Sequence, residues 1–537
     1  MGHNSSKSGH YPASRQVQTK YGPIEGRRIL HEGDKQVDAF QGIPYAQPPV
    51  GELRFALPQE PIPWTEIKET KNFGNRGIQK DNMFQSYVHN LTLNVFTPVW
   101  PSKDEEGFAV LVFIHGGGFV SDSAVKYGDI HIGEYLVRKD LVVVTLQYRL
   151  GYLGFWTTGD GVCPENLALH DQTLALKWVQ ENIKAFNGNP NNVTIMGQSA
   201  GGDMVDLLSL SPVSRDLFHK VIPMAGNSSC DWAIMKDTVT SCKQKAKEFG
   251  IYDDSDSKTY LDKLRAVPAD KFGVDMQIPD PLDKSSTLPI GPKYDKVFLP
   301  KPLDELRKEA PPKPRIIGLA RHEGLIMKLA TMSITNKKPP LADIMDHIGC
   351  ILSEEKFPVN SREVQRKILK KLSVENASKD ELTRALTEVL GDMFMNIGTQ
   401  KNVIDNLKLG AEVYFYSFDY YNPKAYGKLD STHCTDISYV VGTHIVGAFE
   451  FTEVDWRMVD ITTTFWSNFC KYGNPNARTE DEKKLVGEVV WEPSSLENPQ
   501  KHLSINLKPE MKSEFRDGRP KLYLELLEDY QEPRLIF

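Results

Sequence analysis

The stretch VTIMGQSAGGDMVDLLSL (193–210) decides the expected fold, because it predicts a buried strand, a tight turn and a helix in succession. Its turn holds GQSAG (197–201), which matches the pattern G-x-S-x-G. A serine on such a strained turn projects its hydroxyl above the sheet, at the positive end of the following helix. The pattern alone is common in long chains, but the strand, the helix and the additional Gly202 argue against a chance match. Ser199 is therefore the candidate nucleophile.

A second glycine-rich turn follows the apolar strand predicted at 109–115 and reads HGGGF (115–119). Acyl transfer passes through a tetrahedral oxyanion that needs N–H donors already aimed at it, and removing one donor typically costs about 3 kcal/mol. Successive glycines leave their amides open to a ligand. We expect Gly117, Gly118 and Ala200 to supply these donors. The alternative, a glycine turn with no part in chemistry, has little weight beside the serine turn.

A nucleophilic serine needs a histidine as base and an acid that orients it. The chain has 13 histidines, so composition alone does not choose among them. In enzymes with this serine turn the chain order is serine, acid, histidine. Glu323 comes directly after the strand predicted at 314–320, and His433 lies on a loop after the strand predicted at 412–418. His433 is the preferred base, and His444 stays an alternative.

Short strands rich in Val and Ile alternate with helical patterns along the whole chain. The strands are predicted at 109–115, 141–148, 193–197, 220–225, 314–320 and 412–418. This alternation predicts an α/β fold with a large, mostly parallel central sheet flanked by helices. The helical regions 233–310 and 330–410 are expected to be insertions over the active site. We expect a flexible segment at 1–15 and a single domain over 16–537.

Composition and charge exclude several classes of function. The chain has 71 acidic and 64 basic residues, a net charge of −7, and no basic footprint of the kind that nucleic-acid binding needs. Its six cysteines show no CxxC spacing, so a structural zinc site is not expected. No other metal and no cofactor is expected. The N-terminal residues are polar, with no apolar stretch of signal-peptide length, and no apolar run of about 18 residues occurs in the sequence. We therefore expect a cytoplasmic protein with a small-molecule substrate.

Several blocks of the sequence resemble, in order, the type-B carboxylesterases, the family that includes the cholinesterases. The blocks are FQGIPYAQPPVGELRF (40–55), LNVFTP (93–98), HGGGF (115–119), YRLGYLGF (148–155), DQTLALKWVQENI (171–183), NPNNVTIMGQSAGG (189–202) and HEG (322–324). The resemblance covers nearly the whole chain and implies an α/β-hydrolase fold. It also implies a serine carboxylesterase that works through an acyl-serine intermediate, with Ser199, Glu323 and His433 as its triad.

The same resemblance implies roles for residues outside the triad. Arg149 and Asp171 are similar to a structural ion pair of the family, and Trp232 is similar to a wall of its acyl pocket. Phe119, next to the glycines, is expected to contact the substrate as well. Asn90 stands where the family usually has a cysteine, so the first disulfide of the family is expected to be absent.

Other departures from the family pattern lie near the expected site. The segment 71–90 contains no tryptophan, so the aromatic platform that binds choline is missing. Gln198 replaces the frequent glutamate before the serine, and Asp430 replaces a glycine three residues before the histidine. Asp203 and Asp206 are unusual charges in the helix after the turn, and they are either solvated or face the site.

Three other functions compete with ester hydrolysis. An acyltransferase would use the same site and differ only in the final nucleophile. A non-catalytic binding protein on this fold would be expected to show a broken triad. Acetylcholinesterase itself is disfavoured by the missing tryptophan and the missing signal peptide.

The first six residues, MGHNSS, fit the pattern M-G-x-x-x-[ST] for N-myristoylation of Gly2. The pattern is short, and a chance match is a real alternative. A single myristoyl chain gives only marginal, reversible membrane binding. No polybasic cluster or nearby cysteine adds a second anchor, since the first cysteine is Cys163. We therefore expect at most reversible contact with the cytosolic face of a membrane; the oligomeric state is not predicted.

Overall fold

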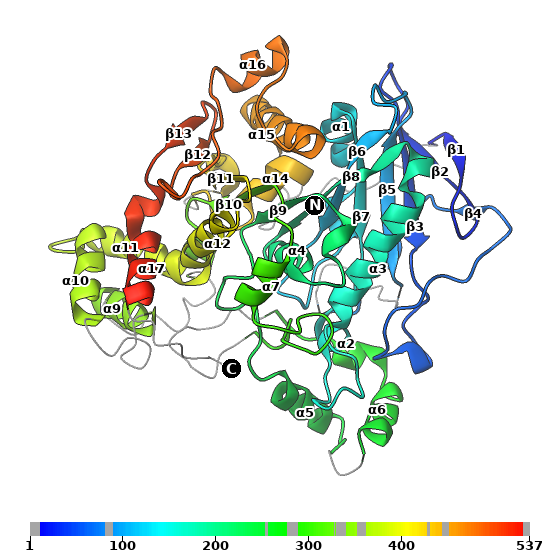
Figure 1. Cartoon of the computed structure of the whole chain (residues 1–537), viewed down its shortest axis with the longest axis horizontal. Helices are drawn as coiled ribbons and strands as arrows, with labels where there is room; N and C mark the ends of the chain where they lie inside the picture. The colour runs from blue at the N-terminus through cyan, green and yellow to red at the C-terminus, as the bar shows by residue number, and fades with distance from the viewer. Residues whose placement is uncertain are drawn as a thin grey trace.

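The chain folds around one large sheet with helices on both faces (Figure 1). The computed structural model describes residues 11–80, 90–252, 256–276, 288–326, 328, 340–351, 361–426, 430–442 and 450–529. Within these residues the sheet has 13 strands in the order β1-β2-β3-β5-β7-β6-β8-β9-β10-β11-β12-β13, and β4 pairs with β2. The seven neighbours from β7 to β12 in this order pair in parallel. The strands on either side of them pair antiparallel, except that β4 pairs with β2 in parallel.

The strands are β1 (Ala13–Gln18), β2 (Pro23–Leu30), β3 (Val37–Pro44), β4 (Lys68–Glu69), β5 (Thr92–Pro98), β6 (Phe108–Ile114), β7 (Leu141–Leu146), β8 (Gly188–Gln198), β9 (Lys220–Met224), β10 (Arg315–Ala320), β11 (Val413–Phe418), β12 (His502–Ile505) and β13 (Glu510–Lys512). The helices are α1 (Ile130–Tyr135), α2 (Gly151–Phe155), α3 (Leu167–Asn182), α4 (Ala200–Leu210), α5 (Thr238–Glu248), α6 (Ser257–Arg265), α7 (Leu303–Glu309), α9 (Pro340–Ile351), α10 (Ser361–Lys371), α11 (Lys379–Gly391), α12 (Ile397–Lys408), α13 (Pro423–Tyr426), α14 (Thr435–Val441), α15 (Glu453–Tyr472), α16 (Glu480–Val486) and α17 (Arg519–Asp529).

The sheet has an apolar core on each face because its central strands are buried on both sides. Val110 and Val112 of β6 pack in the same core as residues of α3 and α4. Leu111 and Phe113, between them in the same strand, pack with residues of α1 and α15 in the core of the opposite face. Successive side chains of a strand point to opposite faces, so an uninterrupted apolar run is what such a position requires.

The predicted α/β fold with a mostly parallel sheet is confirmed, and each of the six predicted strands is present. The helical patterns of both inserted regions are present as α5, α6 and α7 and as α9 to α12. The block 40–55 begins inside a strand, because Phe40 to Pro44 belong to β3. The first strand begins at Ala13, inside the segment 1–15 that was expected to precede the domain.

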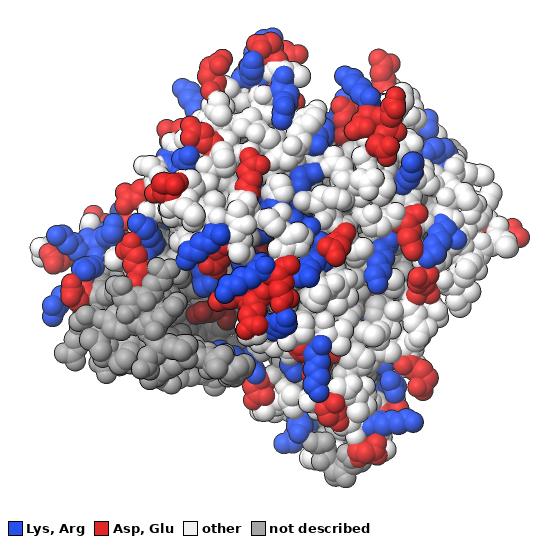
Figure 2. All heavy atoms as spheres, viewed as in Figure 1, with Lys and Arg blue, Asp and Glu red and all other residues white. Residues whose placement is uncertain are grey.

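Acidic and basic side chains are interspersed on the face of the molecule shown in Figure 2. Mixed charge of this kind does not form the single-sign field that attracts nucleic acid. No helix within the described ranges is both long and apolar enough to cross a membrane. None of the six cysteines, all of which lie in the described part of the chain, forms a disulfide.

Candidate active site

Ser199 lies at the point where β8 ends and α4 begins. Its backbone φ and ψ are 59° and −128°, a conformation that residues other than glycine rarely adopt. The turn closes because glycines surround it: a β-carbon on Gly197 would lie 2.2 Å from the carbonyl oxygen of Gly201. The Ser199 N–H donates to the carbonyl of Met224 in the neighbouring strand (2.9 Å), which ties the turn to the sheet.

Three side chains from three separate loops meet at this turn. His433 Nε2 lies 2.9 Å from Ser199 Oγ, and His433 Nδ1 lies 2.5 Å from Glu323 Oε2. The second oxygen of Glu323 accepts from the backbone N–H of Ala320 at 2.8 Å. Ser199 is partly exposed, whereas Glu323 and His433 are buried. The arrangement can move a proton from the hydroxyl to the imidazole while the buried carboxylate stabilises the imidazolium.

The electrostatics of His433 depend on two opposing effects. Burial lowers the pKa of the imidazole, but the neighbouring Cys434 and the Glu323 carboxylate raise it, and the net direction is above the ordinary value. Gln198 Nε2 lies 3.4 Å from His433 Nε2. A neutral amide at position 198 adds no further charge beside the imidazole, unlike the glutamate that is frequent there.

A second buried acid, Asp436, lies one helical turn beyond His433. Its carboxylate accepts from the Tyr416 hydroxyl (2.7 Å) and from the backbone N–H of Ile437 (2.8 Å). Burial, with the charge of Glu323 as a smaller contribution, raises the pKa of Asp436 to about 6. Asp436 is not among the site residues predicted from the sequence, where its only signal is its place three residues after His433.

The glycine loop after β6 packs directly against the serine turn. A β-carbon on Gly116 would lie 3.1 Å from Ser199 Cβ. Gly117 and Gly118 have φ values of 94° and 59°, which glycine adopts without steric cost. Their N–H groups have no acceptor among the described residues. The N–H of Ala200 belongs to the first turn of α4 and has no intrahelical partner either. Three open donors thus surround Ser199.

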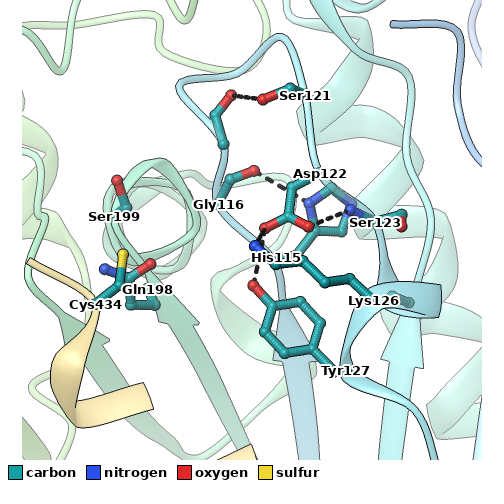
Figure 3. A network of polar contacts seen from close by, with 12 residues as sticks. His115, Gly116, Ser121, Asp122, Ser123, Lys126, Tyr127, Gln198, Ser199 and Cys434 are labelled. Carbon is teal, nitrogen blue, oxygen red and sulfur yellow. Dashed lines mark hydrogen bonds and ion pairs between the residues drawn. The ribbon is translucent and has the colours of Figure 1, made fainter. Parts of the chain in front are cut away.

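Asp122 fastens the chain just beyond these glycines (Figure 3). Its carboxylate accepts from Ser123 N–H (2.7 Å), the Tyr127 hydroxyl (2.9 Å) and Lys126 Nζ (3.2 Å). Its backbone N–H donates to Gln79 Oε1 at 2.8 Å, although its φ of 79° is unfavourable for a residue with a side chain. Burial alone would raise the pKa of Asp122, but Lys126 and these donors hold it below the ordinary value. The sequence reasoning did not find this anchor.

The two residues expected to contact substrate lie together. The rings of Phe119 and Trp232 are 6.0 Å apart, and Trp232 Nε1 donates to the carbonyl of Phe394 at 2.8 Å. Phe119 is fully buried and Trp232 is partly buried. Met276 comes within 3.6 Å of the position a β-carbon of Gly118 would occupy. Both inserted regions therefore reach the site, one through Met276 and the other through Phe394.

Arg149 and Asp171 form the buried ion pair that the resemblance implied. Arg149 Nη2 lies 2.7 Å from one carboxylate oxygen and Arg149 Nε lies 2.8 Å from the other. Arg149 Nη1 also donates to the carbonyl of Ala56 at 2.8 Å. The pair joins the loop after β7 to helix α3.

Asp203 and Asp206 are both fully buried, so the interpretation of either as a solvated charge is wrong. Asp206 lies 3.0 Å from Arg315 and 3.5 Å from Arg307, and it accepts from Asn402 at 2.7 Å. Neither oxygen of Asp203 has a hydrogen-bond partner among the residues that the structure describes. Burial, with a smaller contribution from Asp206, raises the pKa of Asp203 well above its ordinary value.

Comparison with known proteins assigns the chain to a family. The carboxylesterase family matches residues 13–523. The chain belongs to the carboxylesterase family. Esterase cest-33 of Caenorhabditis elegans is 40% identical over 93% of this chain and 91% of its own length. Carboxylesterase 1E of Rattus norvegicus is 30% identical over 88% of each chain, and the juvenile hormone esterase of Tribolium castaneum is 30% identical over 87% of this chain and 84% of its own.

This carboxylesterase is thus a carboxylic-ester hydrolase on the α/β-hydrolase fold. The family implies an ester substrate. Some expectations from the sequence lie outside the described residues: the alternative base His444, the acylation site Gly2, and residues 81–89 of the segment without tryptophan. Among the residues that the structure describes, no group of three His, Cys, Asp or Glu side chains could hold a metal ion.

Proposed function

We propose that Ser199, Glu323 and His433 form the catalytic triad of this carboxylesterase. His433 Nε2 takes the proton from Ser199 Oγ as that oxygen attacks the acyl carbon of the ester. The imidazolium, stabilised by Glu323, then gives the proton to the departing alcohol oxygen, which leaves an acyl-serine. Water attacks this intermediate by the same steps and releases the acid. The contact that carries this proposal is the 2.9 Å approach of His433 Nε2 to Ser199 Oγ.

The negative charge that develops on the carbonyl oxygen needs donors in the same place. We assign this role to the N–H groups of Gly117, Gly118 and Ala200, whose open geometry beside Ser199 supports the assignment. Phe119 and Trp232 are assigned to the apolar wall that holds the acyl group, because their rings lie side by side and the loop of Phe119 packs against Ser199.

The nucleophile is tested by covalent labelling. An uncharged aryl phosphonate should react at one residue, and tryptic mass spectrometry should find the phosphonyl mass on the peptide that contains Ser199. The expected time course is loss of activity in step with labelling, with one phosphonyl group per chain at complete loss. Labelling of a different serine in step with inactivation would overturn the assignment.

The acyl-serine intermediate would also react with an alcohol or amine in place of water. Hydrolysis and transfer share every step up to that intermediate, so the product ratio measures which nucleophile reaches it. An assay of one ester with increasing concentrations of short primary alcohols should show transfer product in competition with free acid. Free acid as the sole product at saturating acceptor would restrict the enzyme to hydrolysis.

Acetylcholine should be a poor substrate compared with a neutral ester of the same shape. The expected reason is that the segment 71–90 provides no tryptophan face for a quaternary ammonium, an interaction worth about 0.5–2 kcal/mol. The measurement is kcat/KM for acetylcholine and for 3,3-dimethylbutyl acetate, in which carbon replaces the charged nitrogen. We expect the neutral ester to be preferred; equal values for the pair would contradict the prediction.

We also infer that Gly2 is myristoylated and that the enzyme acts in the cytoplasm, in reversible contact with membranes. The support is the N-terminal pattern MGHNSS. Intact-mass analysis of protein made together with N-myristoyltransferase should show the added acyl mass, and Gly2→Ala should lack it. Vesicle sedimentation should then separate the two proteins only modestly, since one acyl chain binds membranes weakly. An unmodified Gly2 in that experiment removes the proposed membrane contact.

Asp203 and Asp206 should respond oppositely to alanine substitution. Asp203 is buried with no hydrogen-bond partner in the described part of the chain, which typically costs about 1–3 kcal/mol, so Asp203→Ala should raise the free energy of unfolding. Because burial raises the pKa of Asp203 in the folded state, ionisation of this carboxyl favours the unfolded state. The destabilisation that comes from ionisation is absent when the pH is below the pKa of Asp203 in the unfolded chain, and it grows as the pH rises through that pKa. The gain should therefore be larger at pH 7 than at pH 4.

Asp206→Ala is the matched control on the same helix. It leaves Arg307 and Arg315 buried without their counter-charge, which typically costs about 3–5 kcal/mol. Urea unfolding of the two variants and the wild type at both pH values checks the pair. A loss of stability in Asp203→Ala equal to that in Asp206→Ala would refute the distinction.

A further inference from the structure

His322 lies between two carboxylates that belong to different parts of the fold. It follows β10 on the loop that carries Glu323. Its Nδ1 lies 2.6 Å from Glu388 Oε1 of α11, and its Nε2 lies 3.4 Å from Asp430 Oδ2. Asp430 stands three residues before His433, at the position where the sequence departs from the glycine of the family. Neither His322 nor Asp430 is used by the proposed mechanism.

The contact between His322 and Asp430 joins the same two loops that the triad joins. One loop carries His322 and Glu323 in succession, and the other runs from Asp430 to His433. The two loops are also linked by a backbone hydrogen bond from His322 N–H to the carbonyl of Ser431, at 2.7 Å. A shift of one loop against the other would therefore change the distance between Glu323 and His433, which is 2.5 Å here.

Glu388 gives His322 a fixed point of attachment. Its second oxygen lies 2.5 Å from Arg519 Nη2 at the start of α17, and Arg519 Nε lies 2.8 Å from Asp392. Arg519 and Asp392 are buried, and α11 and α17 pack in one apolar cluster through Leu386, Val389 and Tyr523. His322 is thus held at one side by a packed helical layer and at the other by the loop of His433.

An imidazole that donates a hydrogen bond to a carboxylate on each side needs an N–H group at both ring nitrogens. Only the protonated ring has both N–H groups. Burial lowers the pKa of His322, but the hydrogen bonds and charges of Asp430 and Glu388 raise it, and the net direction is above the ordinary value. The ring also lines a polar cavity of about 390 Å³, and 24% of its side chain is exposed, so its proton can exchange with solvent. Arg321, Arg384 and Arg516 line the same cavity.

We propose that His322 is a positioning residue of this esterase, an imidazolium that ties the Glu323 loop to the His433 loop through Asp430. The role rests on the proposed triad, because His322 acts only by keeping Glu323 in line with His433. It predicts an effect on the chemical step, since neither His322 nor Asp430 belongs to the proposed triad, the N–H donors or the acyl wall. Misplacement of a catalytic group by about 1 Å can cost on the order of 100-fold in rate.

The test compares His322→Gln, His322→Arg, Asp430→Asn and the double variant His322→Gln/Asp430→Asn. His322→Gln should lower kcat by about 10-fold with KM changed by less than about twofold, because alignment is lost and binding is not. His322→Arg keeps a planar cation with donors for both carboxylates and should recover most of kcat. Asp430 is 43% exposed, so Asp430→Asn should fold normally. Asp430→Asn should also lower kcat.

The double variant decides whether the two residues act together. If they form one bridge, the double variant should have nearly the kcat of His322→Gln, whereas independent effects would multiply. His219→Gln is the histidine control, since His219 accepts a backbone hydrogen bond from Val193 and should leave kcat unchanged. Thermal unfolding of every variant separates loss of alignment from loss of fold.

Three outcomes would overturn the proposal: a kcat for His322→Gln within twofold of wild type, a loss confined to KM, or multiplicative effects in the double variant. Failure of the triad itself is recognised separately, because Ser199→Ala would then retain activity. If Ser199→Ala is inactive and His322→Gln is fully active, the triad stands and only the positioning role is lost.

Discussion

Replacement of Ser199 by alanine should lower kcat for a neutral ester by about 10⁶-fold, the loss typical for the nucleophile of a serine triad. Without Oγ no acyl-serine forms, and the remaining N–H donors only polarise a bound ester toward water. The fold should be unaffected, because the side chain is partly exposed and the turn is shaped by the surrounding glycines. Initial-rate kinetics with a chromogenic short-chain ester measure the loss.

Ser209→Ala is a suitable control for this experiment. Ser209 lies on the same helix α4, and its hydroxyl donates to the carbonyl of Asp206 at 2.7 Å without reaching the site. It should keep wild-type kcat and a wild-type thermal midpoint. The nucleophile would lie elsewhere if the Ser199→Ala variant, purified from a host without esterases, kept most of the wild-type activity.

Replacement of His433 by alanine should cause a loss of the same order, about 10⁶-fold in kcat, because serine and histidine act as one unit. The Ser199 hydroxyl would lose the acceptor that lies 2.9 Å from it, and Glu323 would keep a buried charge with no imidazole to orient. His444→Ala should be mild by comparison. Kinetics of both variants on one ester, with circular dichroism to verify folding, provide the measurement.

The two histidines make this a sharp comparison, since they lie 11 residues apart in the sequence. A severe loss in His444→Ala together with a mild loss in His433→Ala would assign the base to His444. The double variant His433→Ala/His444→Ala adds a further check. If His433 alone is the base, this variant should have the same kcat as His433→Ala. A large additional loss would mean that both contribute to the reaction.

Local features of this chain are readable from the sequence because their physical causes are local. The turn at Ser199 needs small residues at fixed places, and those places hold Gly197, Gly201 and Gly202. The central strand β6 is an uninterrupted run of apolar residues, which is what a strand covered on both faces requires. The two C-terminal strands β12 and β13 were not predicted, since they are short and lack such a run.

Contacts between distant segments had no comparable local signal. Asp206 appeared in the sequence only as an unusual charge, and its burial follows from Arg307 and Arg315, which lie more than 90 positions further along the chain. Asp122 was not distinguishable from an ordinary loop aspartate until the side chains around it were placed. Such contacts arise from the way in which helices and loops pack on the sheet. This packing cannot be predicted from the spacing of residues along the chain.

By itself the sequence determined the fold class, the serine turn and the glycine loop, since each depends on neighbouring residues with restricted backbone conformations. It also narrowed the acid and the base to a few candidates through chain order. Only the tertiary structure placed Glu323 and His433, 110 residues apart, within 2.5 Å of each other, and placed His322 between Glu388 and Asp430. The physical reason is that parallel strands bring the loops at their carboxyl ends to one edge of the sheet, whatever their separation along the chain.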